Sequence, residues 1–237
     1  MNIFYIAAIF VGLATSVCAA DPQQNDVDAL ADWNTYVGGW KGVGQPQRGS
    51  VKGAWGEKSD WAWKFEAKHA SLEFLVDEGK LITTGEIKPG KKAGEFELLI
   101  TTPGDDKPVS FIGKKSETGQ FVFDRARDGA ADAIARVTFR QVAENNRLLV
   151  LLERKTGESQ FSRIAEIGYT RQGIQFAASN TGPECIVTGG AGTMAVSYMG
   201  QTYYVCCTGC KDLFDADPAG VIAEYKAKKD KKSGGGK

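Results

Sequence analysis

Histidine is almost absent from this sequence, and its scarcity excludes several kinds of catalytic and metal site. The 237 residues contain one histidine, His69. A serine–histidine–acid triad would have only this base, and no nucleophile motif surrounds any serine. Histidine-rich metal sites are excluded for the same reason. No Walker-type phosphate loop occurs either. We therefore expect a protein that is not an enzyme.

Net charge is also missing, and so are long hydrophobic runs beyond the first twenty residues. The formal net charge is zero, so no overall field attracts nucleic acid. Residues 1–20 carry a short apolar run, Ile3 to Leu13, followed by the small-residue site Cys18-Ala19-Ala20. This pattern is typical of a cleaved signal peptide and is too short to span a bilayer stably. We expect an extracytoplasmic protein, periplasmic or secreted, without stable membrane insertion after signal removal.

Cysteine is missing from the whole middle of the chain, where short alternating apolar runs dominate. Residues 21–36 are expected to form a polar linker and a short helix. Residues 37–180 then show runs such as Trp61-Ala62-Trp63, separated by turn residues such as Pro89-Gly90. About nine to eleven strands follow from this spacing. The fold expected is mainly β, an antiparallel barrel or sandwich, followed by a small α+β module.

The start of this β region resembles the lipocalin-like barrels. Gly38-Gly39-Trp40 matches their Gly-x-Trp opening, and the resemblance implies a tryptophan that closes one barrel end. Trp61 and Trp63 can be core residues or can line a cavity for a small apolar ligand. The second possibility defines an alternative function, a ligand carrier whose C-terminal zinc is purely structural.

The remaining cysteines gather near the C-terminus, where spacing favours a metal over disulfides. Cys185 and Cys206 are separated by twenty residues, and Cys206 and Cys210 by three. We expect a hairpin between the first two, turning at Gly200-Gln201, and a helix that begins near Cys210. Asp217-Pro218 is typical of a helix start, with Asp217 as N-cap. This order can bring a loop sulfur and two strand-to-helix sulfurs to one ion.

This segment resembles the YHS and TRASH-like group of treble-clef metal-binding modules. The resemblance covers residues 183–225, through the cysteine spacing, Tyr203-Tyr204-Val205-Cys206-Cys207 and Phe214-Asp215-Ala216-Asp217-Pro218. The tripeptide that names the YHS group is absent. The resemblance implies heavy-metal binding, trafficking or sensing, with Cys185, Cys206 and Cys210 as ligands. Three soft sulfurs suit Zn(II) or Cu(I).

Several alternatives stay open at this point. Cys207 is the first candidate for a fourth ligand, and Glu184, Asp212 or water are weaker ones. In an oxidising compartment the cysteines can pair as disulfides instead. Cys207-Thr208-Gly209-Cys210 can also be read as a thiol-redox pair. Residues 226–237 carry six lysines against one aspartate and are expected to form a disordered tail.

Overall fold

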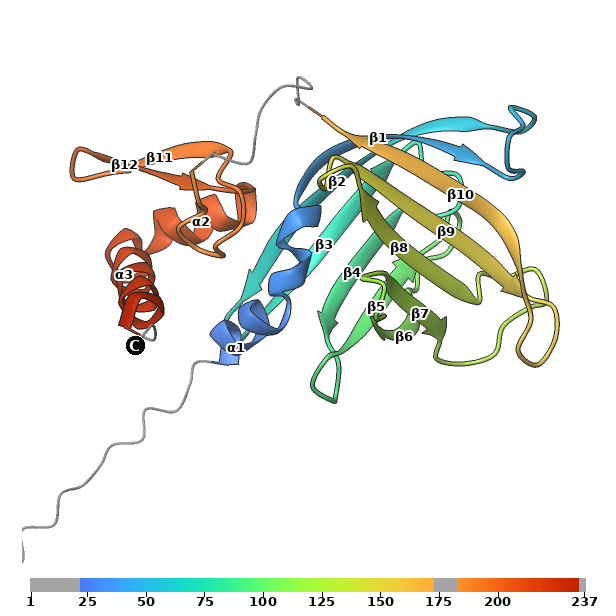
Figure 1. Ribbon diagram of the computed structural model, residues 1–237, viewed down its shortest axis with the longest axis horizontal. Helices are drawn as coiled ribbons and strands as arrows, with labels where there is room; N and C mark the ends of the chain where they lie inside the picture. The colour runs from blue at the N-terminus through green and yellow to red at the C-terminus, as the bar shows by residue number, and fades with distance from the viewer. Residues whose placement is uncertain (1–21, 173–182, 235–237) are drawn as a thin grey trace, which may run out of the picture.

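The protein is mainly β, and its strands close into a barrel that is followed by a small C-terminal unit (Figure 1). A computed structural model describes residues 22–172 and 183–234. Within these residues, ten antiparallel strands form the barrel, and a two-stranded sheet and two helices follow. The elements in chain order are α1 (Pro22–Ala29), the 3₁₀ helix η1 (Ala31–Tyr36), β1 (Gly38–Gln45), β2 (Trp55–Glu66), β3 (His69–Asp77), β4 (Thr84–Pro89), β5 (Glu95–Thr101), β6 (Val109–Lys115), β7 (Phe121–Arg125), β8 (Arg136–Val142), β9 (Arg147–Lys155), β10 (Phe161–Arg171), β11 (Met194–Tyr198), β12 (Gln201–Val205), α2 (Thr208–Ala216) and α3 (Pro218–Gly234).

The barrel is a simple meander that closes on itself. Each strand pairs with the next in the sequence, and β1 pairs with both β2 and β10. Gly42, for example, lies opposite Glu57 on one side and Tyr169 on the other. Closure pairs the first strand with the last and so removes two exposed edges. The predicted mainly β fold is confirmed, and of its two alternatives, barrel and sandwich, the structure has the barrel, whose ten antiparallel strands fit a lipocalin-like fold.

Aromatic side chains fill the barrel interior. Trp33, from η1, is fully buried and stacks on Phe121 with ring centroids 3.9 Å apart. Trp61 stacks on Phe74 at 4.2 Å. Alternate residues of the strands complete this core because side chains alternate between the two faces of a strand. The buried interior aromatics also include Tyr36, Phe96, Phe111, Phe123 and Phe139.

Trp40, on the first strand, packs against an arginine from the last strand. The Trp40 ring is fully buried, and its Nε1 donates to the carbonyl of Tyr36 at 2.8 Å. The guanidinium carbon of Arg171 lies 4.1 Å from the Trp40 ring centroid. Arg171 also donates to the carbonyl oxygens of Val37, at 2.7 Å, and Asn145, at 3.4 Å from Nε. The end of β10, the last barrel strand, is thus tied to β1, the first.

Replacing Arg171 with methionine is expected to destabilise the barrel by about 2–3 kcal/mol, because carbonyls lose charged donors and the ring loses its cation. Urea unfolding monitored by tryptophan fluorescence measures this change. Arg140→Met, at an exposed position on β8, is the control and should change stability by less than about 0.5 kcal/mol. Equal losses of stability in the two variants would contradict the stabilising role assigned to Arg171.

The C-terminal unit contains a hairpin whose turn lies one residue earlier than predicted. Tyr198 pairs with Gln201, so the turn residues are Met199 and Gly200 rather than Gly200 and Gln201. Both turn residues have positive φ, 48° and 77°. Type I′ turns need positive φ at both central positions, and Gly200 meets this need at the second.

Two helices follow the hairpin, and the second is longer than predicted. The predicted cap at Asp217 is present, since its Oδ1 accepts the backbone N–H of Gly220 at 2.9 Å. Helix α3 continues to Gly234, where the lysine-rich sequence was expected to be disordered. At the other end, α1 begins at Pro22, inside the stretch expected to be a linker. The predicted leader, residues 1–20, lies outside the described residues.

Among the described residues, no helix combines the length and hydrophobicity that crossing a bilayer requires.

Candidate metal centre

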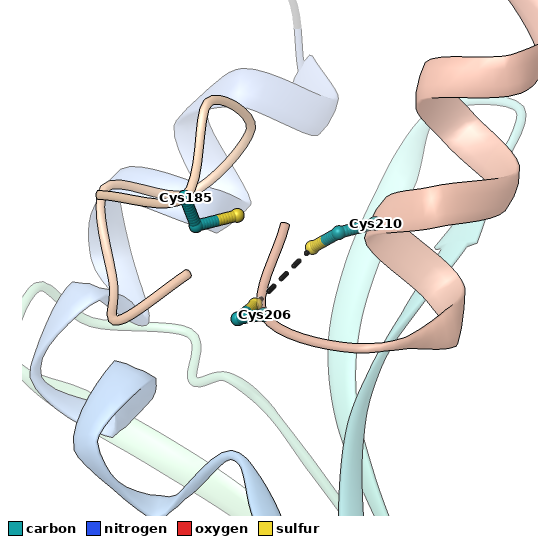
Figure 2. Close-up of side chains that lie close together, drawn as sticks. All are labelled: Cys185, Cys206 and Cys210. Atoms are coloured by element: carbon teal, nitrogen blue, oxygen red, sulfur yellow. Dashed lines mark hydrogen bonds between the residues drawn. The ribbon is translucent and has the colours of Figure 1, made fainter. Parts of the chain in front are cut away.

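Three cysteine sulfurs converge in the C-terminal unit. The Sγ atoms of Cys185, Cys206 and Cys210 all lie within 4.8 Å of one another, and Figure 2 shows the three side chains pointing toward a common space. Cys206 and Cys210 are the nearer pair, with their sulfurs 3.5 Å apart. Cys185 and Cys210 are fully buried, and Cys206 is 6% exposed. The three residues that sequence spacing singled out therefore occupy one buried cluster.

The loop that carries Cys185 is held by its own backbone. Cys185 donates its N–H to the carbonyl of Gly190 at 2.7 Å, and Gly189 donates back to the carbonyl of Cys185 at 2.9 Å. Gly189 has φ of 75°, which favours glycine. The next residue, Ile186, donates to the carbonyl of Tyr204 on β12 at 2.9 Å. These bonds fix the loop against the hairpin and place the Cys185 sulfur beside the end of β12.

The other two sulfurs come from the junction between β12 and α2. Cys206 directly follows the strand, Cys207 adopts an extended conformation as N-cap, and Cys210 lies in the first turn of the helix. Free N–H groups and the helix dipole give a helix start partial positive charge, which favours thiolate over thiol. A strand-to-helix junction therefore supplies both the convergence and the electrostatic setting for metal-binding sulfurs.

The spacing of the sulfurs suits a tetrahedral thiolate site. A Zn–S distance of about 2.3 Å implies sulfurs about 3.8 Å apart around the ion. The observed pairs, 3.5 Å for Cys206 and Cys210 and up to 4.8 Å for the whole set, bracket that value. Small side-chain adjustments would suffice to place three sulfurs around one ion.

The pKa shifts of the four cysteine thiols differ in direction. Hydrogen bonds from Cys206 and Cys210 lower the pKa of Cys185, and hydrogen bonds from the same two residues lower the pKa of Cys207. The bond to Cys185 raises the pKa of Cys206, and burial raises the pKa of Cys210. The pKa is thus lowered at two of the thiols and raised at the other two, which keep their protons more readily. A cation that binds sulfur would replace those protons, since metal binding to cysteine releases them.

Cys207 lies beside the cluster but points toward the barrel. Its sulfur is 3.9 Å from that of Cys206 and accepts the backbone N–H of Trp63 at 3.3 Å. The three converging residues do not include it. Burial raises the pKa of Asp60 on β2, and the nearby Cys207 adds to this shift. The role of Cys207 as fourth ligand stays a prediction, since its sulfur contacts both Cys206 and the backbone of β2.

The weaker candidates for a fourth ligand lie at exposed positions. Glu184 accepts the hydroxyl of Tyr225 at 3.2 Å, and Asp212 is exposed on α2.

All four cysteines of the described residues are free thiols. The Cys206 sulfur contacts the sulfur of Cys210 at 3.5 Å and that of Cys207 at 3.9 Å, and the redox pairing of Cys207 with Cys210 stays a prediction.

The two tryptophans proposed to bind a ligand have different environments. Trp61 faces the barrel interior and lines a cavity of about 10 Å³, which holds roughly one water molecule. Trp63 is not among the residues around that cavity, and its indole Nε1 donates to Asn34 Oδ1 at 3.2 Å. The interior space is far smaller than the 300 Å³ or so that a small-molecule site usually needs. The carrier function stays a prediction, and this packing weighs against it.

The single histidine has a structural partner. His69 Nδ1 lies 3.0 Å from Asp26 Oδ2, and the same oxygen accepts the backbone N–H of Ala70. These contacts join α1 to the start of β3.

Two residues that the sequence did not single out support the cysteines: Thr188 of the C-terminal unit and Asn34 of the barrel unit. Thr188 Oγ1 lies 3.6 Å from the Cys206 sulfur, and the carbonyl of Thr188 accepts Asn34 Nδ2 at 3.0 Å. Asn34 belongs to η1, 154 residues away in the chain. Spacing along the sequence carries no signal for such a contact.

Comparisons with known proteins add little to this geometry. No protein-family model matches the chain, and a comparison with curated proteins gave no match. Among solved structures, the chain is similar to the crystal structure of Rv2717c from M. tuberculosis, with 14% sequence identity and a TM-score of 0.40. That similarity covers 61% of this chain and 97% of the other. A likeness at this level carries no information about function.

Proposed function

We propose that residues 183–225 form a metal-binding module that holds one thiophilic ion through Cys185, Cys206 and Cys210. The observation that carries this proposal is the convergence of three buried sulfurs within 4.8 Å. Binding an ion through all three sulfurs requires three buried thiolates, whose charge would be costly without the cation. The ion would also contribute folding free energy to a unit with a small core of its own.

The local fold supports assigning this module to the YHS and TRASH-like treble-clef group. Its order is a cysteine loop, the hairpin of β11 and β12, and a helix that carries Cys210 in its first turn. In that group such modules handle heavy metals. The protein is then a non-enzymatic binder of Zn(II) or Cu(I), acting in metal binding, trafficking or sensing outside the cytoplasm. Burial of the sulfurs favours stable retention of the ion.

A thiol-redox function is the competing proposal, and one contact favours it. The sulfurs of Cys206 and Cys210 are 3.5 Å apart, close enough that an external disulfide could oxidise the pair by thiol–disulfide exchange. Metal binding and disulfide formation use the same sulfurs, so the two functions exclude each other at any moment.

Titration of the reduced protein with Co²⁺ tests the proposed function. We expect saturation at one ion per chain, with thiolate-to-metal charge-transfer absorption, and stoichiometric displacement by Zn²⁺. Binding should weaken as the pH falls, because protons compete for the ligand sulfurs. Cys207→Ser should retain the one-ion stoichiometry if three cysteines suffice. Absence of saturable binding at equimolar ion would reject the metal function and leave the redox alternative.

A further inference from the structure

The module occupies an unpaired stretch of strand edge on the barrel. Strand β1 pairs with β2 only as far as Gly38 opposite Trp61. Two residues further along β2, the backbone N–H of Trp63 donates to the Cys207 sulfur at 3.3 Å instead of to a strand. A Cβ added to Gly209 would lie 1.8 Å from the carbonyl oxygen of Trp63. The start of α2 therefore rests directly on the backbone of the barrel.

A second set of contacts runs from the same tryptophan to a ligand sulfur. The Trp63 indole donates to Asn34 Oδ1 at 3.2 Å, and Asn34 Nδ2 donates to the carbonyl of Thr188 at 3.0 Å. The hydroxyl of Thr188 lies 3.6 Å from the Cys206 sulfur. The Asn34 amide oxygen thus accepts a hydrogen bond from the barrel, and the amide nitrogen donates one to the module.

The cysteine loop also approaches Asn34 closely. A Cβ added to Gly190 would lie 3.1 Å from the Asn34 Cβ. Gly190 is the residue whose carbonyl accepts the N–H of Cys185. The Asn34 side chain thus touches the loop that positions Cys185 and, through Thr188, approaches Cys206.

We propose that Trp63 and Asn34 of the barrel unit are positioning residues of the metal centre, so that ion binding and docking of the module on the barrel strengthen each other. The inference rests on the proposed metal-binding function. Outer hydrogen bonds orient metal ligands, and their loss typically weakens affinity by about 10–100-fold. The coupling is reciprocal: a barrel that holds the ligand loops favours the ion, and the bound ion favours docking.

Matched substitutions in the full chain test this role. Trp63→Phe removes the indole donor but retains the backbone N–H and an aromatic ring. Trp61→Phe is its control, since Trp61 is an equally buried residue of β2 whose Nε1 has no partner among the described residues. Asn34→Leu removes both amide contacts. Thr35→Val, its control, removes a hydroxyl bond to Gln141 within the barrel unit.

Zn²⁺ affinity, measured by competition with a chromophoric chelator, is the main readout. Trp63→Phe and Asn34→Leu should each weaken binding about tenfold, and both controls should stay within about twofold of the parent protein. The Co²⁺ ligand-field absorption should shift in the two positioning variants only, which loss of stability alone would not produce. Thermal unfolding of the metal-free proteins shows whether each variant folds. If Trp63→Phe does not fold, the Zn²⁺ affinity of Asn34→Leu tests the positioning role.

Two different failures are distinguishable. Parent protein that binds no Zn²⁺ rejects the proposed function and this inference with it. Parent protein that binds Zn²⁺, with positioning variants that bind equally well or controls that weaken equally, rejects the inference alone.

Discussion

Replacing Cys206 with serine is expected to weaken Zn²⁺ binding by at least about 100-fold. Structural zinc sites bind with roughly 10–16 kcal/mol shared among a few ligands, so losing one thiolate costs about 3 kcal/mol or more. Cys206 is the most connected sulfur, 3.5 Å from Cys210 and 3.9 Å from Cys207. Competition with a chelator measures the affinity, and the stabilisation of the fold by added Zn²⁺ should disappear in parallel.

Cys207→Ser is the matched control for this variant. It changes the adjacent residue, which lies on the same strand-to-helix junction but is not one of the three converging cysteines. Its Zn²⁺ affinity should fall much less than that of Cys206→Ser. Equal losses in both variants would show that Cys207 is also a ligand, and an unchanged affinity in Cys206→Ser would exclude the proposed site.

Replacing Gly209 with alanine is expected to destabilise the folded protein by about 2–4 kcal/mol. In most helices this substitution stabilises, by up to about 1 kcal/mol. Here the added Cβ would lie 1.8 Å from the carbonyl oxygen of Trp63, and backbone cannot move aside as a side chain can. The start of α2 must then lift away from β2, and the bond from Trp63 to Cys207 stretches. Thermal unfolding in the presence and absence of Zn²⁺ measures the loss.

Gly56→Ala is the control for the Gly209 variant. A Cβ at Gly56 meets nothing within 4 Å, so its stability should stay within about 0.5 kcal/mol of the parent protein. A Gly209→Ala protein as stable as the parent would contradict the close packing of α2 on the barrel.

Sequence patterns predicted the strands of the barrel well because the signal of a strand is local. Alternation of apolar residues marks a strand wherever one face is buried, as along β2 around Trp61 and Trp63. The choice between barrel and sandwich was left open, because it depends on whether β1 and β10 meet. That pairing joins segments such as Gly42 and Tyr169, whose separation no short-range pattern can bridge.

Errors in the C-terminal unit also have physical causes. The hairpin turn shifted by one residue because Met199 accepts a positive φ that sequence rules assign to Gly, Asn or Asp. Composition suggested a disordered tail from Lys226, yet α3 continues to Gly234. Lysine is itself a good helix former, and the helix is anchored at its start by the Asp217 cap.

Cysteine spacing and the family resemblance together indicated the three sulfurs that converge, but not the residues that support them. Cys206 and Cys210 are near neighbours in sequence, and the hairpin returns the chain to Cys185. Asn34 and Trp63 come from the opposite end of the chain. Their contacts depend on how the module docks on the barrel, which is a property of the complete fold.

Metal and thiol analysis of the protein purified without reductant tests the central claim most directly. Elemental analysis gives bound ions per chain, and thiol titration before and after chelation under denaturing conditions gives the redox state of the four C-terminal cysteines. The account predicts one thiophilic ion per chain and four reduced thiols, of which the three ligand thiols react only after the ion is removed. Metal-free protein with disulfides between these cysteines would contradict it.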